Sequence, residues 1–153
     1  MDDPARADKT CTTLACRTSL RLAALRALAA AGDRRTDFLQ SIFAQRANLG
    51  LAEEAALGVF LQQTPGWRSQ ADTVASELSQ RVYLTGRYAN VQPPGPWYGS
   101  LPQAQAAYLE LLVARGASAE DQDRALRALV AQSCRCGWPS LGDKMCIRDR
   151  YDW

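Results

Sequence analysis

The sequence contains no histidine. This absence removes the commonest general base, a frequent zinc ligand and every Ser-His or Cys-His catalytic pair. The sequence also lacks a Gly-rich phosphate loop, a G-x-S-x-G nucleophile turn and an Asp-rich metal motif. No cysteine is followed by Gly-Glu-Gln, so these 153 residues contain no thioester motif. We therefore expect a protein that is not an enzyme and holds no cofactor.

Long hydrophobic runs and a strong net charge are lacking as well. The longest apolar run, residues 22–31, is interrupted by Arg26 and is far shorter than the roughly 20 residues of a membrane-spanning helix. Met1 is followed by two aspartates, without the basic and apolar regions of a signal peptide. The net charge of +2 is too small to indicate a nucleic-acid partner. We expect neither a membrane span nor nucleic-acid binding.

The cysteines are the most reactive residues that the sequence offers. Cys11 and Cys16 are separated by four residues, and Cys134 and Cys136 by one. This spacing does not match the two knuckles of a structural zinc site. A disulfide would require an oxidising compartment. We expect no metal site, favour ordinary thiols, and leave the disulfide state of the four cysteines open.

Acidic pairs near two expected helix starts are the other candidates for chemistry. Glu53 and Glu54 form one pair, and Asp121 and Asp123 the other. Favourable interaction with the helix macrodipole and capping explain both pairs, whereas acid–base catalysis would require a cleft and a raised pKa. We therefore predict no catalytic, cofactor-binding or metal-binding residue. Three tryptophans beside helix ends are expected to cover the core and not to stack on a ligand: Trp67, Trp97 and Trp138.

The two ends of the chain differ from the rest. Residues 144–150 resemble the translation of a transposon-end adapter used to build sequencing libraries, because AAG-ATG-TGT-ATA-AGA-GAC-AGR encodes them. We expect residues 144–153, Cys146 included, to derive from such an adapter and exclude them from the fold. Residues 1–17 lack clear periodicity and are expected to be a leader of uncertain order. The domain then spans residues 18–143.

The composition of this domain predicts an all-α fold. Apolar residues make up 47% of the chain; Ala and Leu are abundant and β-branched residues few, which favours helix over sheet. Apolar residues at helical spacing predict three successive helix pairs. The first helices of the pairs are expected at residues 18–31, at 51–63 and from 100, and the second helices from 36, from 69 through 81, and from 118.

Capping signals and internal repetition support these pairs. Glycines are expected to end the first helices, at Gly32, Gly66 and Gly116, and short polar residues to begin the second ones, at Thr36, Ser69 and Ser118. Residues 38–45 align without a gap with residues 125–132, and the first two units are about 35 residues apart, as in helical repeat arrays. The second helices are expected to direct the following apolar side chains inward: Phe38, Leu39, Ile42, Phe43, Val74, Leu78, Ala125, Leu126, Leu129 and Val130.

An insertion interrupts the array between the second and third pairs. Residues 82–91 are rich in β-formers around Thr85-Gly86, which predicts a short β-hairpin or an extended insertion. Pro93, Pro94 and Pro96 follow it and exclude both helix and central strand there.

The succession LRLAALRALAAAG, DFLQSIFAQRANLGLAEEAALGVFLQQ, VYLTGRYANV, WYGSLPQAQAAYLELLVARGA and ALRALVAQSCRCGWPS resembles bacterial alpha-2-macroglobulins over about residues 18–143. The resemblance is to the later part of their thioester domain, an α/α toroid of helical hairpins. It implies a periplasmic or cell-envelope protein that traps proteases after cleavage of a bait region. The chain holds neither bait nor thioester, so the resemblance implies a structural role in the toroid, with proteases and the remaining domains as partners of the whole protein.

Two other functions remain open from the residues alone. The first is an α-solenoid scaffold for protein binding, which would present an open concave face. The second is a helical-toroid enzyme, which would require Asp121, Asp123 and other acidic residues to converge in a central cavity.

Overall fold

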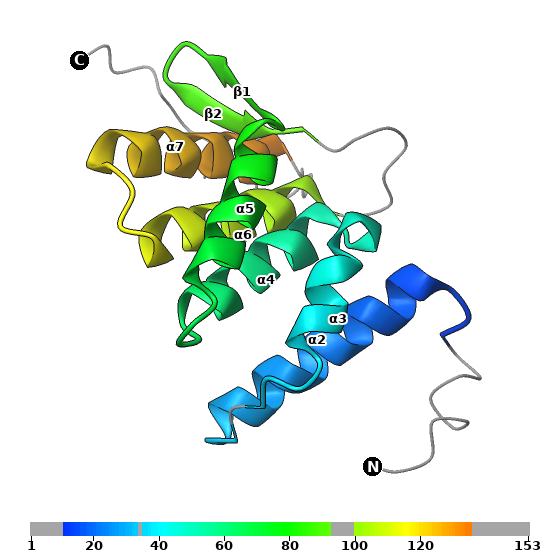
Figure 1. Cartoon of the computed structure of the whole chain (residues 1–153). Coiled ribbons are helices and arrows are strands. Elements are labelled where there is room, and N and C mark those ends of the chain that lie inside the picture. Colours follow the sequence, from blue (N-terminus) through cyan, green and yellow to red (C-terminus); the bar gives the residue numbers. More distant parts are fainter. Residues whose placement is uncertain (1–10, 34, 93–99, 136–153) are drawn as a thin grey trace.

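The structure, a computed structural model, describes residues 11–33, 35–92 and 100–135 (Figure 1). The expected adapter-derived tail at 144–153, Trp97, Trp138 and the side chains of Cys134, Cys136 and Cys146 lie outside the described residues. The elements, in chain order, are α2 (Leu14–Ala30), α3 (Leu39–Ala44), the 3₁₀ helix η1 (Arg46–Asn48), α4 (Leu51–Gln62), α5 (Arg68–Ser79), β1 (Val82–Thr85), β2 (Tyr88–Val91), α6 (Leu101–Ala114) and α7 (Ala119–Arg135).

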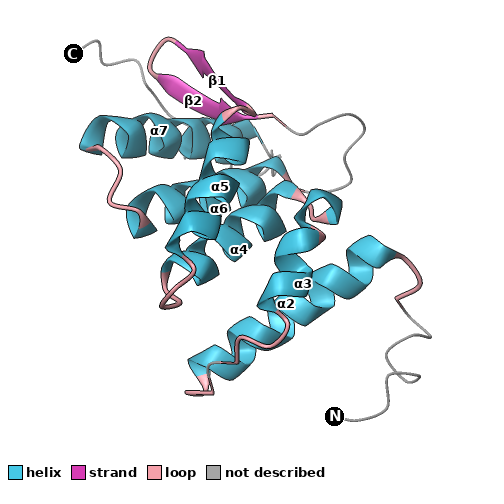
Figure 2. Cartoon of the chain, in the orientation of Figure 1, coloured by secondary structure: helices cyan, strands magenta, loops and turns pink. Residues whose placement is uncertain are grey.

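The predicted fold class, all-α with a short β-hairpin, is confirmed (Figure 2). The hairpin lies within residues 82–91, as expected, and its strands pair antiparallel from Val82 opposite Val91 to Thr85 opposite Tyr88. Gly86, in the turn between them, has a φ of 58°, a backbone angle that residues other than glycine rarely adopt. The β-forming segment thus folds back on itself, as the sequence around this glycine predicts.

Helix α4 is the centre of the molecule. It packs most extensively against α6 and α5, and it also contacts α2, while α6 packs against α7. In Figure 1, α2 lies at one side of the molecule and α7 at the other, with α4 and α6 between them. The residues of α4 that are buried cover its whole circumference: Leu51, Glu54, Ala55, Ala56, Leu57, Gly58, Val59, Phe60 and Leu61. A helix buried all round is typical of the interior of a multi-helix domain.

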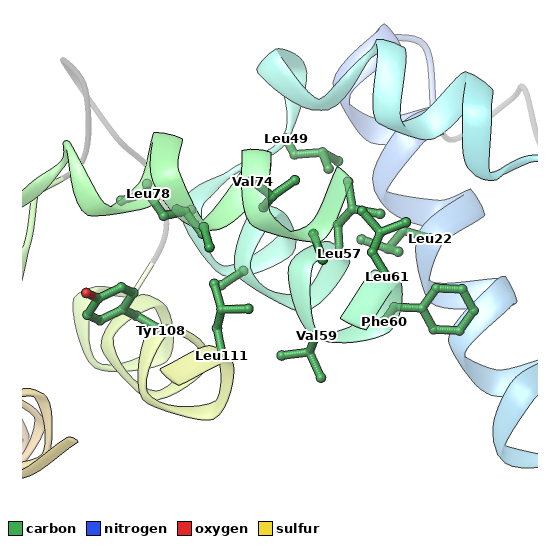
Figure 3. Packing of buried hydrophobic residues seen from close by; sticks show 14 of the residues in the cluster. Leu22, Leu49, Leu57, Val59, Phe60, Leu61, Val74, Leu78, Tyr108 and Leu111 are labelled. Atoms are coloured by element: carbon green, nitrogen blue, oxygen red, sulfur yellow. The ribbon is translucent and has the colours of Figure 1, made fainter. Parts of the chain in front are cut away.

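Gly58 allows α6 to approach α4 closely. A Cβ at this position would lie 2.9 Å from Leu111 Cδ1 and 3.2 Å from Val74 Cγ1. These neighbours come from α6 and α5. Figure 3 shows Leu57, Leu61, Val74 and Leu111 around this part of the core. The missing side chain therefore lets the three helices share one apolar centre.

Several predicted helix ends are confirmed. Helix α6 follows Ser100, as expected, with a proline in its first turn, and the Ser100 hydroxyl accepts the Gln103 amide at 3.4 Å. The Ser118 hydroxyl accepts the Asp121 amide at 3.1 Å and donates to its carboxylate at 2.6 Å. The glycines expected at helix ends have positive φ: Gly32 at 91°, Gly66 at 83° and Gly116 at 65°.

Other predicted boundaries are wrong. Helix α2 begins at Leu14, inside the expected leader, because Thr13 caps it by accepting the Cys16 amide at 3.2 Å. Thr36 does not cap α3: its carbonyl accepts the Leu39 amide in a turn, and the helix follows Phe38 without a side-chain cap. Ser69 does not cap α5 either, since that helix already begins at Arg68.

The predicted inward residues of the second helices are only partly confirmed. Leu39, Ile42, Val74, Leu78 and Ala125 are buried, Phe43 and Leu129 are half-buried, and Phe38, Leu126 and Val130 are 52%, 47% and 56% exposed. The gapless alignment places Leu39 over Leu126, yet the first is fully buried and the second is not. The reason is that α7 meets its neighbours through a narrow face of small residues, Ala125 and Ala128.

Gln105 joins the hairpin to α6 and α7. Its Nε2 donates to the carbonyls of Ala89 at 2.9 Å and Ala125 at 3.1 Å, and its Oε1 accepts the Val91 amide at 3.0 Å. The Gln132 amide also lies 3.4 Å from this oxygen. The side chain is fully buried. A buried primary amide thus satisfies the edge of β2 as a neighbouring strand would.

Candidate functional site

The acidic pair at the start of α4 does not form a catalytic pair. Glu54 is buried, and its carboxylate accepts a hydrogen bond of 2.6 Å from Arg81, whereas Glu53 is half-buried on another face. Burial raises the pKa of Glu54, and the charge of Arg81 partly opposes this rise. Its Oε1 has no hydrogen-bond partner among the described residues. Glu54 therefore ties α4 to the segment after α5.

A second ion pair lies beside Glu54. The Arg46 guanidinium donates to both carboxylate oxygens of Glu77, at 2.8 and 2.6 Å, and to the Phe43 carbonyl at 3.0 Å. The hydrogen bonds from Arg46 lower the pKa of Glu77, and burial opposes the shift. Because this pair is bidentate, it holds η1 in a fixed orientation against α5.

The two carboxylates of the other acidic pair, Asp121 and Asp123, do not act together either. The Asp121 carboxylate accepts the Ser118 hydroxyl in the first turn of α7, while Asp123 pairs with Arg127 at 2.6 Å on the exposed surface of that helix. The two carboxylates therefore have separate structural partners. Within the described ranges, no group of three or more His, Cys, Asp or Glu residues is arranged to hold a metal ion.

Cys11 and Cys16 form a disulfide, with Cα atoms 5.5 Å apart. This corrects the interpretation of both residues as ordinary thiols. Cys16 lies in the first turn of α2, and Cys11 is buried with its carbonyl 3.3 Å from the Arg17 Nε that donates to it. The bridge therefore fixes the segment before α2 against the beginning of the helix.

Two neighbouring cavities lie along the first helices of the pairs. Their volumes are about 330 Å³ and about 280 Å³, and both are lined by α2, α4 and α6. Arg26 and Glu110 line both cavities, and Glu53 lines the larger one. The rest of the wall combines alanines with polar side chains such as Ser19, Gln103 and Gln63.

A cleft of different character lies between α5 and the turn that joins α6 to α7. Its volume is about 350 Å³. Four polar residues of different chemistry line it beside an apolar wall: Ser79, Tyr108, Arg115 and Asp121. We refer to it as the α5–α6 cleft.

The sequence pattern predicted little of this cleft. Tyr108 is only 8% exposed. The sequence pattern explained Asp121 by capping and the helix macrodipole; in the structure Ser118 is the cap, and the Asp121 carboxylate accepts the Ser118 hydroxyl. The pattern assigned no role to Arg115, and nothing in the helical period shows that α5 would bring Ser79 to the same place.

No helix in the described ranges is both long enough and apolar enough to cross a membrane.

Comparisons with known proteins place the helix pairs in a family context. The chain is similar to an alpha-2-macroglobulin homolog from Nostoc sp. (strain PCC 7120 / SAG 25.82 / UTEX 2576), with 36% identity over 123 residues. The matched part is 79% of this chain but 6% of that protein, so the chain spans a small fraction of its relative's length. No protein-family model matches the chain, and no solved structure does. The similarity to this homolog supports the alpha-2-macroglobulin family for the chain.

Proposed function

We propose that the chain is a fragment of a bacterial alpha-2-macroglobulin-like inhibitor that traps proteases, and that its helices form part of the α/α toroid of the thioester domain. The observation that carries this proposal is the 36% identity over 79% of the chain to an alpha-2-macroglobulin homolog. In this proposal the fragment is a structural, non-catalytic part of the inhibitor.

The packing of the helices supports a toroid wall. The first helices of the pairs form a continuous layer, because α4 contacts both α2 and α6. Each second helix packs on its own partner, as α3 does on α2, α5 on α4 and α7 on α6. Alternation of two helix layers along the chain is the arrangement that a toroid or a solenoid requires. The toroid is favoured over the solenoid by the similarity to the macroglobulin homolog.

The disulfide supports a location in the periplasm or cell envelope. Disulfides persist in oxidising compartments such as the bacterial periplasm and are rare in the cytosol. Cys11–Cys16 connects residues five positions apart at the start of α2. A protease trap outside the cytoplasm would benefit from such a bridge, because the bridge would fix the start of α2 before the protein meets a protease.

The parent gene provides the direct test. We expect an uninterrupted reading frame in which macroglobulin domains precede this segment and a further helix follows Asp143 in place of residues 144–153. An upstream reading frame without macroglobulin domains would contradict the proposal.

The full-length parent protein provides the functional test. Mixed with an active protease, it should block digestion of a large protein substrate while cleavage of a small peptide substrate continues, because a trapped protease stays active inside a steric enclosure. The matched control is the same protease with its active site blocked beforehand, which should not be captured. Equal inhibition of both substrates would indicate an ordinary active-site inhibitor and would refute trapping.

A further inference from the structure

The α5–α6 cleft is lined by a tyrosine whose hydroxyl is available to a ligand. Tyr108 is 8% exposed and lines the cleft, and no hydrogen bond to its hydroxyl is formed by the residues that the structure describes. Figure 3 shows this hydroxyl at the end of the ring remote from Leu111. A hydroxyl that is open to the cleft and has no protein partner forms hydrogen bonds to water or to a bound molecule. The Tyr108 hydroxyl can therefore donate or accept a hydrogen bond inside the cleft.

Two opposite charges share this cleft without touching. Arg115 forms only a long contact of 3.4 Å with Asp72, and both side chains are substantially exposed. Asp121 accepts from Ser118 through Oδ2. No ion pair within 4.0 Å joins Arg115 to Asp121 in the described part of the chain. The guanidinium retains N–H groups, and the carboxylate a second oxygen, for another molecule.

Arg115 and Asp121 line the same cleft as Tyr108, and the charges of both act on its hydroxyl. Burial raises the pKa of its hydroxyl, the negative charge of Asp121 raises it further, and the positive charge of Arg115 acts in the opposite direction. One cation and one anion thus act on the same hydroxyl. A simple anion would gain from Arg115 and lose from Asp121, and a simple amine the reverse.

The apolar wall defines the rest of the ligand. Leu111 and Leu112 line the cleft beside the polar groups. At about 350 Å³ the cleft falls within the range of small-ligand sites. A molecule that carries both charges at one end and an aliphatic group at the other would use every part of this lining.

We propose that the α5–α6 cleft binds an α-amino acid with an aliphatic side chain. Arg115 and Tyr108 bind its carboxylate, Asp121 binds its ammonium group, and the leucines contact its side chain. This site is independent of the protease-trapping function and of the family.

Calorimetric titration of the full chain with L-leucine tests the proposal. We expect saturable binding, and at least about tenfold weaker binding of 4-methylpentanoate, which lacks the ammonium group, and of 3-methylbutylamine, which lacks the carboxylate. Absence of saturable binding of L-leucine, or equal binding of the three compounds, would overturn the proposal.

Single substitutions in the cleft test whether L-leucine binds there. Tyr108→Phe removes only the hydroxyl and should weaken L-leucine binding about tenfold. Arg115→Gln should weaken it at least as much. Arg124→Gln is the matched control, since Arg124 pairs with Glu120 outside the cleft, and it should leave the affinity unchanged. If Arg115→Gln fails to fold, the affinity of Tyr108→Phe for L-leucine is the test of the site. An unchanged affinity in that variant would overturn the assignment of the site.

Discussion

Gln105 shows how much one side chain contributes to this fold. All four hydrogen-bonding positions of its amide are used, by two carbonyls, one backbone amide and Gln132. Gln105→Ala would leave the buried Ala89 carbonyl and Val91 amide unpaired, whereas the Ala125 carbonyl would keep its bond within α7. Each unpaired group costs roughly 1–3 kcal/mol, so we expect the free energy of unfolding to fall by about 2 kcal/mol or more.

Chemical denaturation of Gln105→Ala measures this loss. The matched control is Gln103→Ala on the same helix, because Gln103 is exposed and its side chain has no role in the network. That variant should stay within about 0.5 kcal/mol of the unmodified protein. Equal losses in the two variants would show that the hydrogen bonds of Gln105 add nothing beyond helix propensity.

Two glutamates should make opposite contributions to stability as the pH changes. Burial raises the pKa of Glu54, so its stabilising contribution is present below the unfolded-state pKa and is lost as pH rises through the folded-state pKa. Arg46 lowers the pKa of Glu77, so its contribution is present above the unfolded-state pKa and is lost as pH falls through the folded-state pKa.

Single glutamine variants separate these two effects. Relative to the unmodified protein, Glu54→Gln should gain stability as the pH rises from the acid range to neutrality, and Glu77→Gln should lose it. Unfolding free energies measured in denaturant across that range give both slopes. Slopes of the same sign would contradict the assignment of the two carboxylates.

At the scale of single elements, the boundaries set by short-range capping could be predicted from sequence. Ser100 and Ser118 each bond an amide three residues away, so the pattern that marks them lies within a few letters. The start of α2 is also set by a short-range cap, Thr13, but residues 1–17 show no clear apolar periodicity, so the sequence does not indicate a helix there. Thr18, expected at the beginning of the helix, is buried inside it, and its hydroxyl lies 3.0 Å from the side chain of Gln45, a contact across 27 residues that no local pattern contains.

The residues of the candidate sites were less predictable for the same reason. Glu54 and Arg81 are 27 residues apart, and Arg115 and Asp72 are 43. A helical period indicates which face of a helix is apolar, but not which polar side chain of another helix will meet it. Gln105 lies on the buried face of α6, where the period alone suggests an apolar residue.

The disulfide should stabilise the beginning of α2. A bridge that closes a loop of this length contributes about 2 kcal/mol in the chain-entropy account. We expect reducing agent to lower the free energy of unfolding by up to this amount and to loosen the first turn of the helix. Thermal or chemical unfolding with and without reductant measures the change.

Thiol alkylation under denaturing conditions is the control for the bridge. Two more cysteines should react after reduction than before, and in Cys16→Ala the reductant should no longer affect stability through this pair. If the same number of cysteines reacts before and after reduction, Cys11 and Cys16 are not joined.

For the molecule as a whole, α7 presents an apolar surface that its own core does not use. Leu126 and Val130 lie one turn apart and are 47% and 56% exposed. In the proposed toroid, a further helix pair would cover this surface. We expect the isolated chain to bind a hydrophobic dye or to self-associate.

Replacing both side chains tests this expectation. Leu126→Gln combined with Val130→Gln should reduce dye binding and self-association, while the free energy of unfolding changes by no more than about 1 kcal/mol, because neither residue is in the core. The control is Val113→Gln on α6, where a single exposed valine is replaced. If the unmodified chain is monodisperse and does not bind the dye, the prediction is wrong.

The amide network of Gln105 also has a kinetic consequence. The hairpin precedes α6 in the chain, yet the Val91 amide proton is protected by a side chain 14 residues later, and the same side chain bonds Ala125 of α7. The hairpin can form its own ladder early, but this proton is shielded only once α6 has docked. Hydrogen exchange at Val91 therefore reports the assembly of the third helix pair onto the rest of the molecule.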